Sequence, residues 1–383
     1  MPVIFVSMRI AVNPLLLQNE HLEGVDQYAK EIICHLIKAH PEQEFIFHYN
    51  SSENREKIVD TKLTPDRLLT KITNLPAFIY WNALKPPKLL GTKKVDIWIQ
   101  PNAIACLNTM IPQIVIIQNI KSQVNLNKVA WYYRRLHKLF IKKSINKAKC
   151  IITLSEIEKK TLLQYYPLAS QKVVAIKGAA NQIFQPMEWQ DKEQVKAGFA
   201  DSREYFLFTE YTPVEENLMN VLKAFSLFKK WQQSNMKLLV CKGLSSEFNQ
   251  IEEKLKTYKY REDVILLKQF STEQLARITA TAYAFIFPST YNGSGLPILD
   301  AMQCEVPVIA GNVPANQEIG GEAALYVNFS EPDAIAKEML SLYKDESLRA
   351  RLIEAGKIQV ATQSWDKAGE QLWLNICKTM QKG

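Results

Sequence analysis

Residues 285–325 read FIFPSTYNGSGLPILDAMQCEVPVIAGNVPANQEIGGEAAL. The first three residues continue an apolar run that begins at Ala284, and such runs are typical of strands buried inside a parallel sheet. The loop 292–295 contains two glycines, at which a ligand or another backbone segment can approach closely. Pro297 favours the first turn of a helix, and the apolar run 308–310 predicts the next strand. A glycine loop that leads into a helix is an anion-binding arrangement, because free N–H groups and the positive end of the helix dipole face the same point.

This segment resembles the donor-site signature of the retaining glycosyltransferases of family 4 (glycosyl transferases group 1), which have the GT-B fold. The pattern of that family is close to P-S-x-x-E-G-F-G-L-P-x-L-E-A-M-A-x-G-x-P-V-I-A. Two departures are visible, because the two glutamates of the family pattern are Asn292 and Asp300 here. The positions that fit the pattern are Pro288, Ser289, Gly293, Gly295, Leu296, Pro297, Ala301, Met302, Pro307, Val308, Ile309 and Ala310.

The resemblance implies that a nucleotide-sugar donor binds at this segment. Asp300 is one methylene shorter than glutamate, and it either accepts hydrogen bonds from ribose hydroxyls or only stabilises its own helix. Asn292, at a catalytic position of the family, can hydrogen-bond a sugar hydroxyl but cannot offset positive charge that develops at the anomeric carbon. The expected donor-binding residues in this segment are Gly293, Ser294, Gly295, Leu296 and Asp300.

The chain as a whole predicts two α/β domains. Its 383 residues are enough for two full cores. Apolar strand-like runs alternate with helical segments, which predicts doubly wound parallel sheets; Ser155 and Ser271 are expected to cap two of the helices. The resemblance implies two Rossmann-like domains that face a cleft. The expected divisions are an acceptor-side domain 1–187 with a returning C-terminal helix 365–383, and a nucleotide-sugar domain 188–364.

Composition narrows the class of protein. A hydrophobic content of 47% and a charged content of 22% are ordinary for a soluble globular protein. No apolar run reaches the 18 residues of a membrane span, and the N-terminal residues do not read as a signal peptide. The six cysteines and five histidines are scattered, so the sequence favours a cytoplasmic protein with no metal and no cofactor.

The first domain carries a degenerate ligand position. Residues 114–119 read IVIIQN, where the family has a strand that ends in His-Asp. Gln118 and Asn119 take these catalytic positions, and they keep hydrogen-bonding ability while losing titratable chemistry. Ligands of open α/β sheets bind beyond the carboxyl ends of strands, which is where these residues are expected. On the acceptor side, the loop of Gly24 is expected to face the cleft, and Asp26 either reaches an acceptor sugar or stabilises the first turn of its helix.

The second domain departs from the family at the donor diphosphate. After the strand 205–209 the family pattern is near G-x-x-x-x-R-K-N-L, whereas this chain has Glu210 at the glycine and Glu215 and Glu216 at the basic pair. Two like charges 4 Å apart repel by about 4 kcal/mol at an effective dielectric constant near 20. These carboxylates would therefore oppose a diphosphate. Lys242, at the end of another strand, is a cation expected near the site.

Residues 121–149 contain nine lysines and arginines and no acidic residue, with aromatic and leucine residues at helical spacing. One interpretation is a basic amphipathic helix that contacts an anionic membrane or a phosphorylated acceptor. The other is a solvated helix face backed by core aromatics. Nucleic acid is not an expected partner, because no nucleic-acid-binding motif accompanies the charge.

Two functions are compatible with these patterns. The first is a retaining, metal-independent transfer of a sugar from a nucleotide-sugar donor to a glycan, lipid or small acceptor. The second is a catalytically degraded GT-B scaffold that acts as a binding or regulatory subunit with a protein partner, since the departures fall on the donor and catalytic positions. A sugar epimerase of the same fold is a weaker third alternative. Fold alone does not choose among them, and enzymatic activity is left open.

Overall fold

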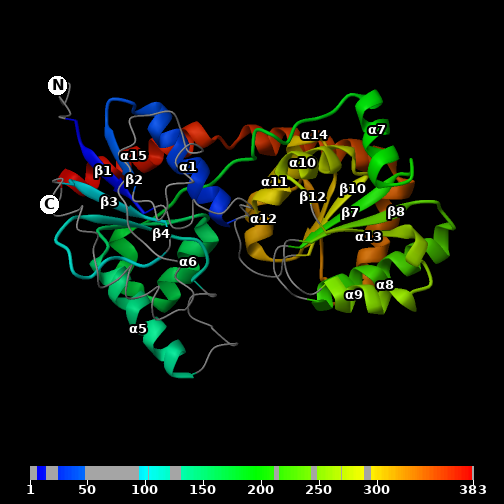
Figure 1. Ribbon diagram of the computed structural model, residues 1–383, viewed down its shortest axis with the longest axis horizontal. Helices are drawn as coiled ribbons and strands as arrows, with labels where there is room; N and C mark the ends of the chain where they lie inside the picture. The colour runs from blue at the N-terminus through cyan, green and yellow to red at the C-terminus, as the bar shows by residue number, and fades with distance from the viewer. Residues whose placement is uncertain are drawn as a thin grey trace. The chain divides into compact units, whose positions relative to one another are not determined.

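The computed structural model describes residues 7–13, 25–47, 95–101, 103–120, 131–210, 215–242, 248–268, 270–288 and 295–381 (Figure 1). The chain forms two compact units, Met1–Gly178 with Ser364–Gly383, and Ala179–Gln363. The first boundary was expected at 187, but the chain passes into the second unit at Ala179. Asn181 and Phe184 are hydrogen-bonded to the helix that follows the glycine loop, within the second unit.

The first unit is a parallel six-stranded sheet of order β2-β1-β3-β4-β5-β6. Most residues of its strands are buried, as expected for parallel strands covered by helices on both faces. The strands are β1 Arg9–Val12, β2 Glu44–Phe47, β3 Ile97–Gln100, β4 Gln113–Ile117, β5 Cys150–Thr153 and β6 Val173–Ala175. The described helices of this unit are α1 Val25–Ala39, α5 Trp131–Lys147, α6 Glu156–Tyr165, the short η3 Pro167–Lys172 and α15 Trp365–Gln381.

Helix α15 returns from the C-terminal end of the chain to pack along α1 in this unit, and Figure 1 shows the blue and red helices side by side. Gly369 is at the contact, and a Cβ added there would lie 3.1 Å from the backbone nitrogen of Leu36. The ring of Tyr28 meets that of Trp365 edge to face at 5.6 Å, and its hydroxyl donates to the carbonyl of Ile176 at 2.7 Å. The helix pair is therefore held by close backbone approach and by aromatic packing.

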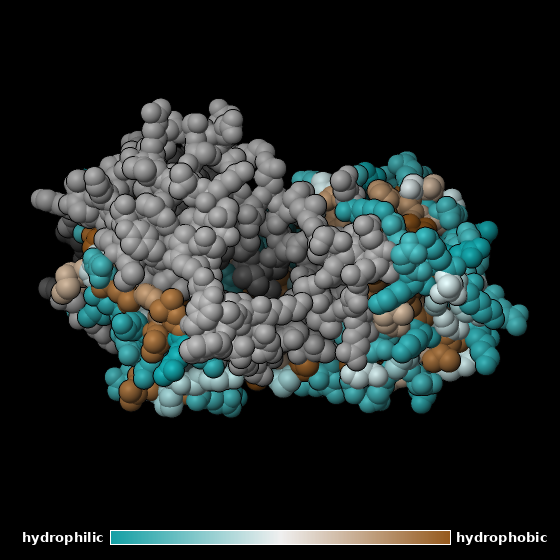
Figure 2. Space-filling view, turned by 60° about the horizontal axis from the view of Figure 1, so that its bottom comes forward, coloured by the Kyte–Doolittle hydropathy of each residue, from teal (hydrophilic) through white to brown (hydrophobic). Residues whose placement is uncertain are grey.

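The second unit is a parallel six-stranded sheet of order β12-β11-β10-β7-β8-β9. Its core is rich in phenylalanine, and mostly hydrophilic residues cover the described surface of this unit on the face that Figure 2 shows. The strands are β7 Tyr205–Glu210, β8 Lys237–Lys242, β9 Val264–Leu267, β10 Ala284–Phe287, β11 Val308–Gly311 and β12 Ala324–Val327. The helices are α7 Trp189–Phe199, α8 Glu215–Gln232, α9 Phe248–Lys256, η4 Arg261–Asp263, α10 Thr272–Thr281, α11 Leu296–Gln303, α12 Pro314–Gly320, α13 Pro332–Lys344 and α14 Glu346–Ala361.

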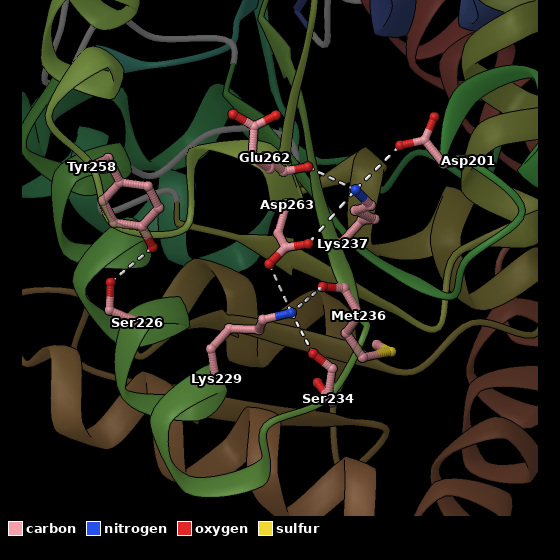
Figure 3. A network of polar contacts seen from close by, with 9 residues as sticks. All are labelled: Asp201, Ser226, Lys229, Ser234, Met236, Lys237, Tyr258, Glu262 and Asp263. Carbon is pink, nitrogen blue, oxygen red and sulfur yellow. Dashed lines mark hydrogen bonds and ion pairs between the residues drawn. The ribbon is translucent and has the colours of Figure 1, made fainter.

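A buried polar network joins the end of α8 to the start of β9 (Figure 3). The ammonium of Lys229 contacts a carboxylate oxygen of Asp263 at 2.9 Å and the carbonyls of Ser234 and Met236. The other oxygen of Asp263 faces Lys237, the first residue of β8, at 3.6 Å. This network lies at the amino end of the sheet, whereas ligands of such sheets bind at the carboxyl end. Its role is to close the turn between α8 and β8.

Candidate functional site

The carboxyl end of β10 leads through the glycine loop to α11, as the sequence predicts. Gly295 is the residue before the helix and has a φ of 61°, a left-handed conformation that favours glycine. A Cβ at this position would lie 2.9 Å from Cδ1 of Ile319, so the isoleucine side chain would have to move to make room for it. Leu296 is buried in the core. Asn292, Gly293 and Ser294 lie outside the described residues, and their expected contacts with a donor stay predictions.

We expect Gly295→Ala to lower the free energy of unfolding by about 2 kcal/mol, because a left-handed conformation costs a residue with a Cβ roughly 1–2 kcal/mol and the contact with Ile319 adds to it. In an Ile319→Ala background the clash disappears. Gly295→Ala should then lower the free energy of unfolding by less, and the remaining loss is the cost of the left-handed backbone conformation. Chemical denaturation of the four proteins measures both parts. Equal stability of Gly295→Ala and the unchanged protein would contradict the strained conformation.

Asp300 has a contact that the sequence did not indicate. Its side chain is 5% exposed, and its Oδ1 accepts the backbone N–H of Asn181 at 2.7 Å. From the next turn of α11, the amide of Gln303 donates to the carbonyls of Asn181 and Phe184 at 3.2 and 2.6 Å. Helix α11 therefore holds segment 181–184, and this is why the second unit begins before the expected boundary. Asp300 was expected to bind ribose hydroxyls, but at least one of its carboxylate oxygens is already hydrogen-bonded within the protein.

The thiol next to this carboxylate is not a candidate nucleophile. Burial raises the pKa of Cys304, and the charge of Asp300 raises it further. The thiol is therefore protonated near neutral pH, and a protonated thiol is a poor nucleophile.

The acidic positions expected near a diphosphate lie at the carboxyl end of β7 and the start of α8. Glu210 ends β7 and is the register partner of Lys242, which ends β8. Neighbouring strands are about 4.8 Å apart, so the backbone places an acidic and a basic position side by side. Glu215 and Glu216 are the first two residues of α8. The side chains of all four residues lie outside the described part of the chain, so their effect on a diphosphate stays a prediction.

In the first unit, Gln118 follows the carboxyl end of β4. Its side chain is 6% exposed, and neither its oxygen nor its nitrogen has a hydrogen-bond partner among the residues that the structure describes. A buried polar group left unpaired costs about 1–3 kcal/mol, so a partner supplied by a ligand would remove a real penalty. Asn119 is partly exposed beside it.

A second pair of amides was missed by the sequence analysis. Gln100 ends β3, is fully buried, and accepts a hydrogen bond from the amide of Asn13 at 2.9 Å. Its own nitrogen has no partner within the described ranges. The available signal was an amide residue directly after an apolar run of sequence, which is the same signal that Gln118 carries.

The remaining expected positions are only partly described. Gly24 lies outside the described residues, and Asp26 lies in the first turn of α1 with its side chain outside them. In the part of the chain that the structure describes, no three His, Cys, Asp or Glu side chains lie together as a metal site requires, and no helix there is both long and apolar enough to span a membrane. The expectation of a metal-independent protein stays a prediction.

The part of the chain that matches a known protein family lies within the second unit. Residues 190–359 match the model of the family Glycosyl transferases group 1. The match covers most of the second unit and includes β10, the glycine loop and α11.

Similar proteins include enzymes of O-antigen assembly. The chain is 27% identical to O-antigen chain mannosyltransferase B of Escherichia coli over 248 residues, which is 64% of this chain and 63% of that protein. It is 26% identical to O-antigen chain mannosyltransferase RfbU of Salmonella typhimurium over 200 residues, 51% of this chain and 50% of the relative. These matches thus span less than two thirds of the length of either relative.

Solved structures resemble the chain over nearly its whole length. A glycosyltransferase from Rickettsia africae has a TM-score of 0.73 at 13% identity, covering 99% of this chain and 100% of that one. HepE of Anabaena, in complex with UDP and glucose, has a TM-score of 0.74 at 12% identity, covering 97% and 99%. WaaG, a glycosyltransferase involved in lipopolysaccharide biosynthesis, has a TM-score of 0.74 at 12% identity, covering 95% and 98%. These likenesses confirm the fold predicted from the sequence, an α/β protein of GT-B type.

Proposed function

We propose that this protein transfers a sugar from a nucleotide-sugar donor to a glycan acceptor with retention of configuration. The observation that carries the proposal is the match of residues 190–359 to group 1 glycosyltransferases, a range that includes β10, the glycines after it in the sequence, and α11. Two similar proteins are named as O-antigen mannosyltransferases, which favours mannose as the transferred sugar.

Under this proposal, one group of site residues would contact the donor phosphates and another would contact the transferred sugar. The backbone of the loop before α11 would approach the donor phosphates, and Lys242 would add a positive charge. Gln118, Asn119 and Asn292 would contact the transferred sugar. Amides both donate and accept hydrogen bonds, so they can orient hydroxyl groups, but they cannot take up a proton near neutral pH. These three residues would therefore orient the sugar and would not act as a general base.

Calorimetric titration of the full chain with UDP, GDP and ADP, and then with their mannose and glucose conjugates, tests the proposal. We expect one nucleotide to bind in the micromolar range and its sugar to be transferred in the presence of a chelator. The configuration of the product, determined by NMR, tests retention. A folded protein that binds none of these compounds would overturn the proposal and favour a scaffold that works through a protein partner.

We propose in addition that α5 contacts the anionic inner face of a membrane, where a lipid-linked acceptor would be found. The described part of this helix exposes four basic residues and the side chains of Leu136 (40%) and Leu139 (52%). Basic and apolar groups exposed together on one helix are typical of an interfacial helix. The exposed basic residues are Arg135, Lys138, Lys142 and Lys143.

Replacing Lys142 and Lys143 by glutamine should weaken binding to vesicles that contain anionic lipid by about 30-fold, since each basic residue near such a surface contributes about 1 kcal/mol. Co-sedimentation with phosphatidylglycerol vesicles measures the change, and phosphatidylcholine vesicles are the lipid control. The exposed Lys337 of α13, changed to glutamine, is the protein control. Equal binding of all variants would exclude α5 as the contact.

A further inference from the structure

A buried carboxylate joins α6 to the turn that carries Gln118. Glu158 lies in the first turn of α6, and its own backbone N–H is capped by the hydroxyl of Ser155 at 3.0 Å. The residue is only 1% exposed, and its Oε1 accepts the backbone N–H of Ile120 at 2.5 Å. Because β4 and β5 are neighbours in the sheet, α6 begins close to the end of β4. The carboxylate thus links two consecutive loops at the carboxyl edge of this sheet.

The contact between Glu158 and Ile120 lies two residues from Gln118, whose side chain has no hydrogen-bond partner within the described residues. The amide of Gln118 has no hydrogen-bond partner within the described part of the chain, so polar contacts to its side chain do not fix its position there. The backbone of Gln118 is fixed on one side by β4 and on the other by the bond from Ile120 to Glu158. A hydrogen bond from a backbone N–H to a carboxylate is stronger than one to a neutral acceptor, so this contact can hold the turn. Burying a carboxyl group is costly unless it is hydrogen-bonded, and the N–H of Ile120 supplies such a bond.

The side-chain oxygen and nitrogen of Gln118 are both unpaired among the described residues, and this favours a ligand group of a particular chemistry. Its N–H donates and its carbonyl accepts, so a group that both accepts and donates satisfies it fully. A sugar hydroxyl does this, whereas a phosphate or carboxylate oxygen would leave the carbonyl of Gln118 unpaired. Hydrogen-bonding capacity therefore favours an uncharged sugar hydroxyl at Gln118.

We infer that Glu158 is a positioning residue that holds the turn 118–120 so that Gln118 can bind a sugar hydroxyl during transfer. The inference rests on the proposed function and assigns a role to a residue outside the donor-site signature. Glu158 acts through Gln118 and does not itself contact the sugar.

Four variants of the full chain test this role: Glu158→Met, which loses the acceptor; Glu158→Gln, which keeps an acceptor oxygen; Gln118→Ala; and the combination Gln118→Ala with Glu158→Met. We expect Glu158→Met to lower kcat at least tenfold while KM for the donor changes less than twofold. Glu158→Gln should recover at least a third of the original kcat.

Hydrogen exchange of residues 118–120 should become faster in Glu158→Met and stay slow in Glu158→Gln. The matched control is Glu156→Gln, an exposed residue of the same helix turn, which should change none of these quantities.

The double variant separates positioning from a purely structural role. If Glu158 acts through Gln118, kcat of the double variant should equal that of Gln118→Ala within about twofold. Losses that multiply, or faster exchange with unchanged kcat, would overturn the inference alone. A folded wild-type protein that transfers no sugar from any donor would overturn the proposed function, and with it this inference, before any variant is compared.

Discussion

Lys229→Met should lower the free energy of unfolding of the second unit by about 3 kcal/mol. Lys229 is buried and satisfies the carboxylate of Asp263 and two backbone carbonyls at the turn between α8 and β8 (Figure 3). Breaking a buried ion pair by removing one partner typically costs about 3–5 kcal/mol. We expect the lower end, because Asp263 is 25% exposed and also faces Lys237. The methionine side chain is still apolar and long enough to fill most of the space of the lysine stem.

Hydrogen exchange of the β8 amides at equilibrium measures this loss, since a core strand exchanges through opening of the unit. The next residue is a matched control: Lys230 is exposed, and Lys230→Met should change stability by less than about 0.5 kcal/mol. Asp263→Asn should cost less than Lys229→Met, because Lys229 keeps its two carbonyl partners. Similar effects of Lys229→Met and Lys230→Met would contradict the structural role of the network.

Gly369→Leu should have an effect of similar size, about 3 kcal/mol, in the first unit. The atoms nearest to an added Cβ are backbone atoms of α1, the nitrogen of Leu36 at 3.1 Å and the carbonyl carbon of His35 at 3.2 Å. Backbone atoms cannot move aside as a flexible side chain does, so α15 would have to separate from α1. Overpacking costs typically 1–3 kcal/mol, and separation also weakens the contact of Trp365 with Tyr28.

Hydrogen exchange across 365–381 would show the detachment of α15 directly. Gly369→Ala should lie between the two proteins, because the gain in helix propensity of about 1 kcal/mol opposes the contact with α1. Gln371→Leu, two residues further at an exposed position of the same helix, should leave exchange unchanged. Protection of α15 that survives Gly369→Leu would mean that the close approach of the helices does not require glycine.

Several elements were predictable because their cause is local. The apolar runs of β4 and β10 are buried along their whole length, and continuous apolar runs are the signature of parallel strands covered on both faces. The predicted caps are confirmed: the hydroxyl of Ser155 accepts from the N–H of Glu158, and Ser271 forms a capping box with Gln274. Each of these features depends on residues within one turn or one strand.

The candidate site was predictable only in part. The glycine loop and the residues after β4 could be proposed as site residues because they lie next to strand ends in the sequence, where a family pattern can be compared. The roles of Gln100 and Gln303 were missed, since their partners are distant in the chain: Asn13 for Gln100, and Asn181 and Phe184 for Gln303. Single-sequence patterns carry no information about such pairs.

The loss of titratable groups at Gln118 and Asn119 is visible only by comparison with the pattern of the family that the chain resembles. The fold class, the alternation of strands and helices, and the glycine before α11 are predictable from the sequence alone. These follow from residue type and spacing, which act over a few residues. Three contacts became visible only in the folded chain: Asp300 holds the backbone of Asn181, Gln118 is buried without a partner among the described residues, and Glu158 anchors Ile120. Those facts depend on which strand ends and loops become neighbours, and the packing of the complete sheet sets that.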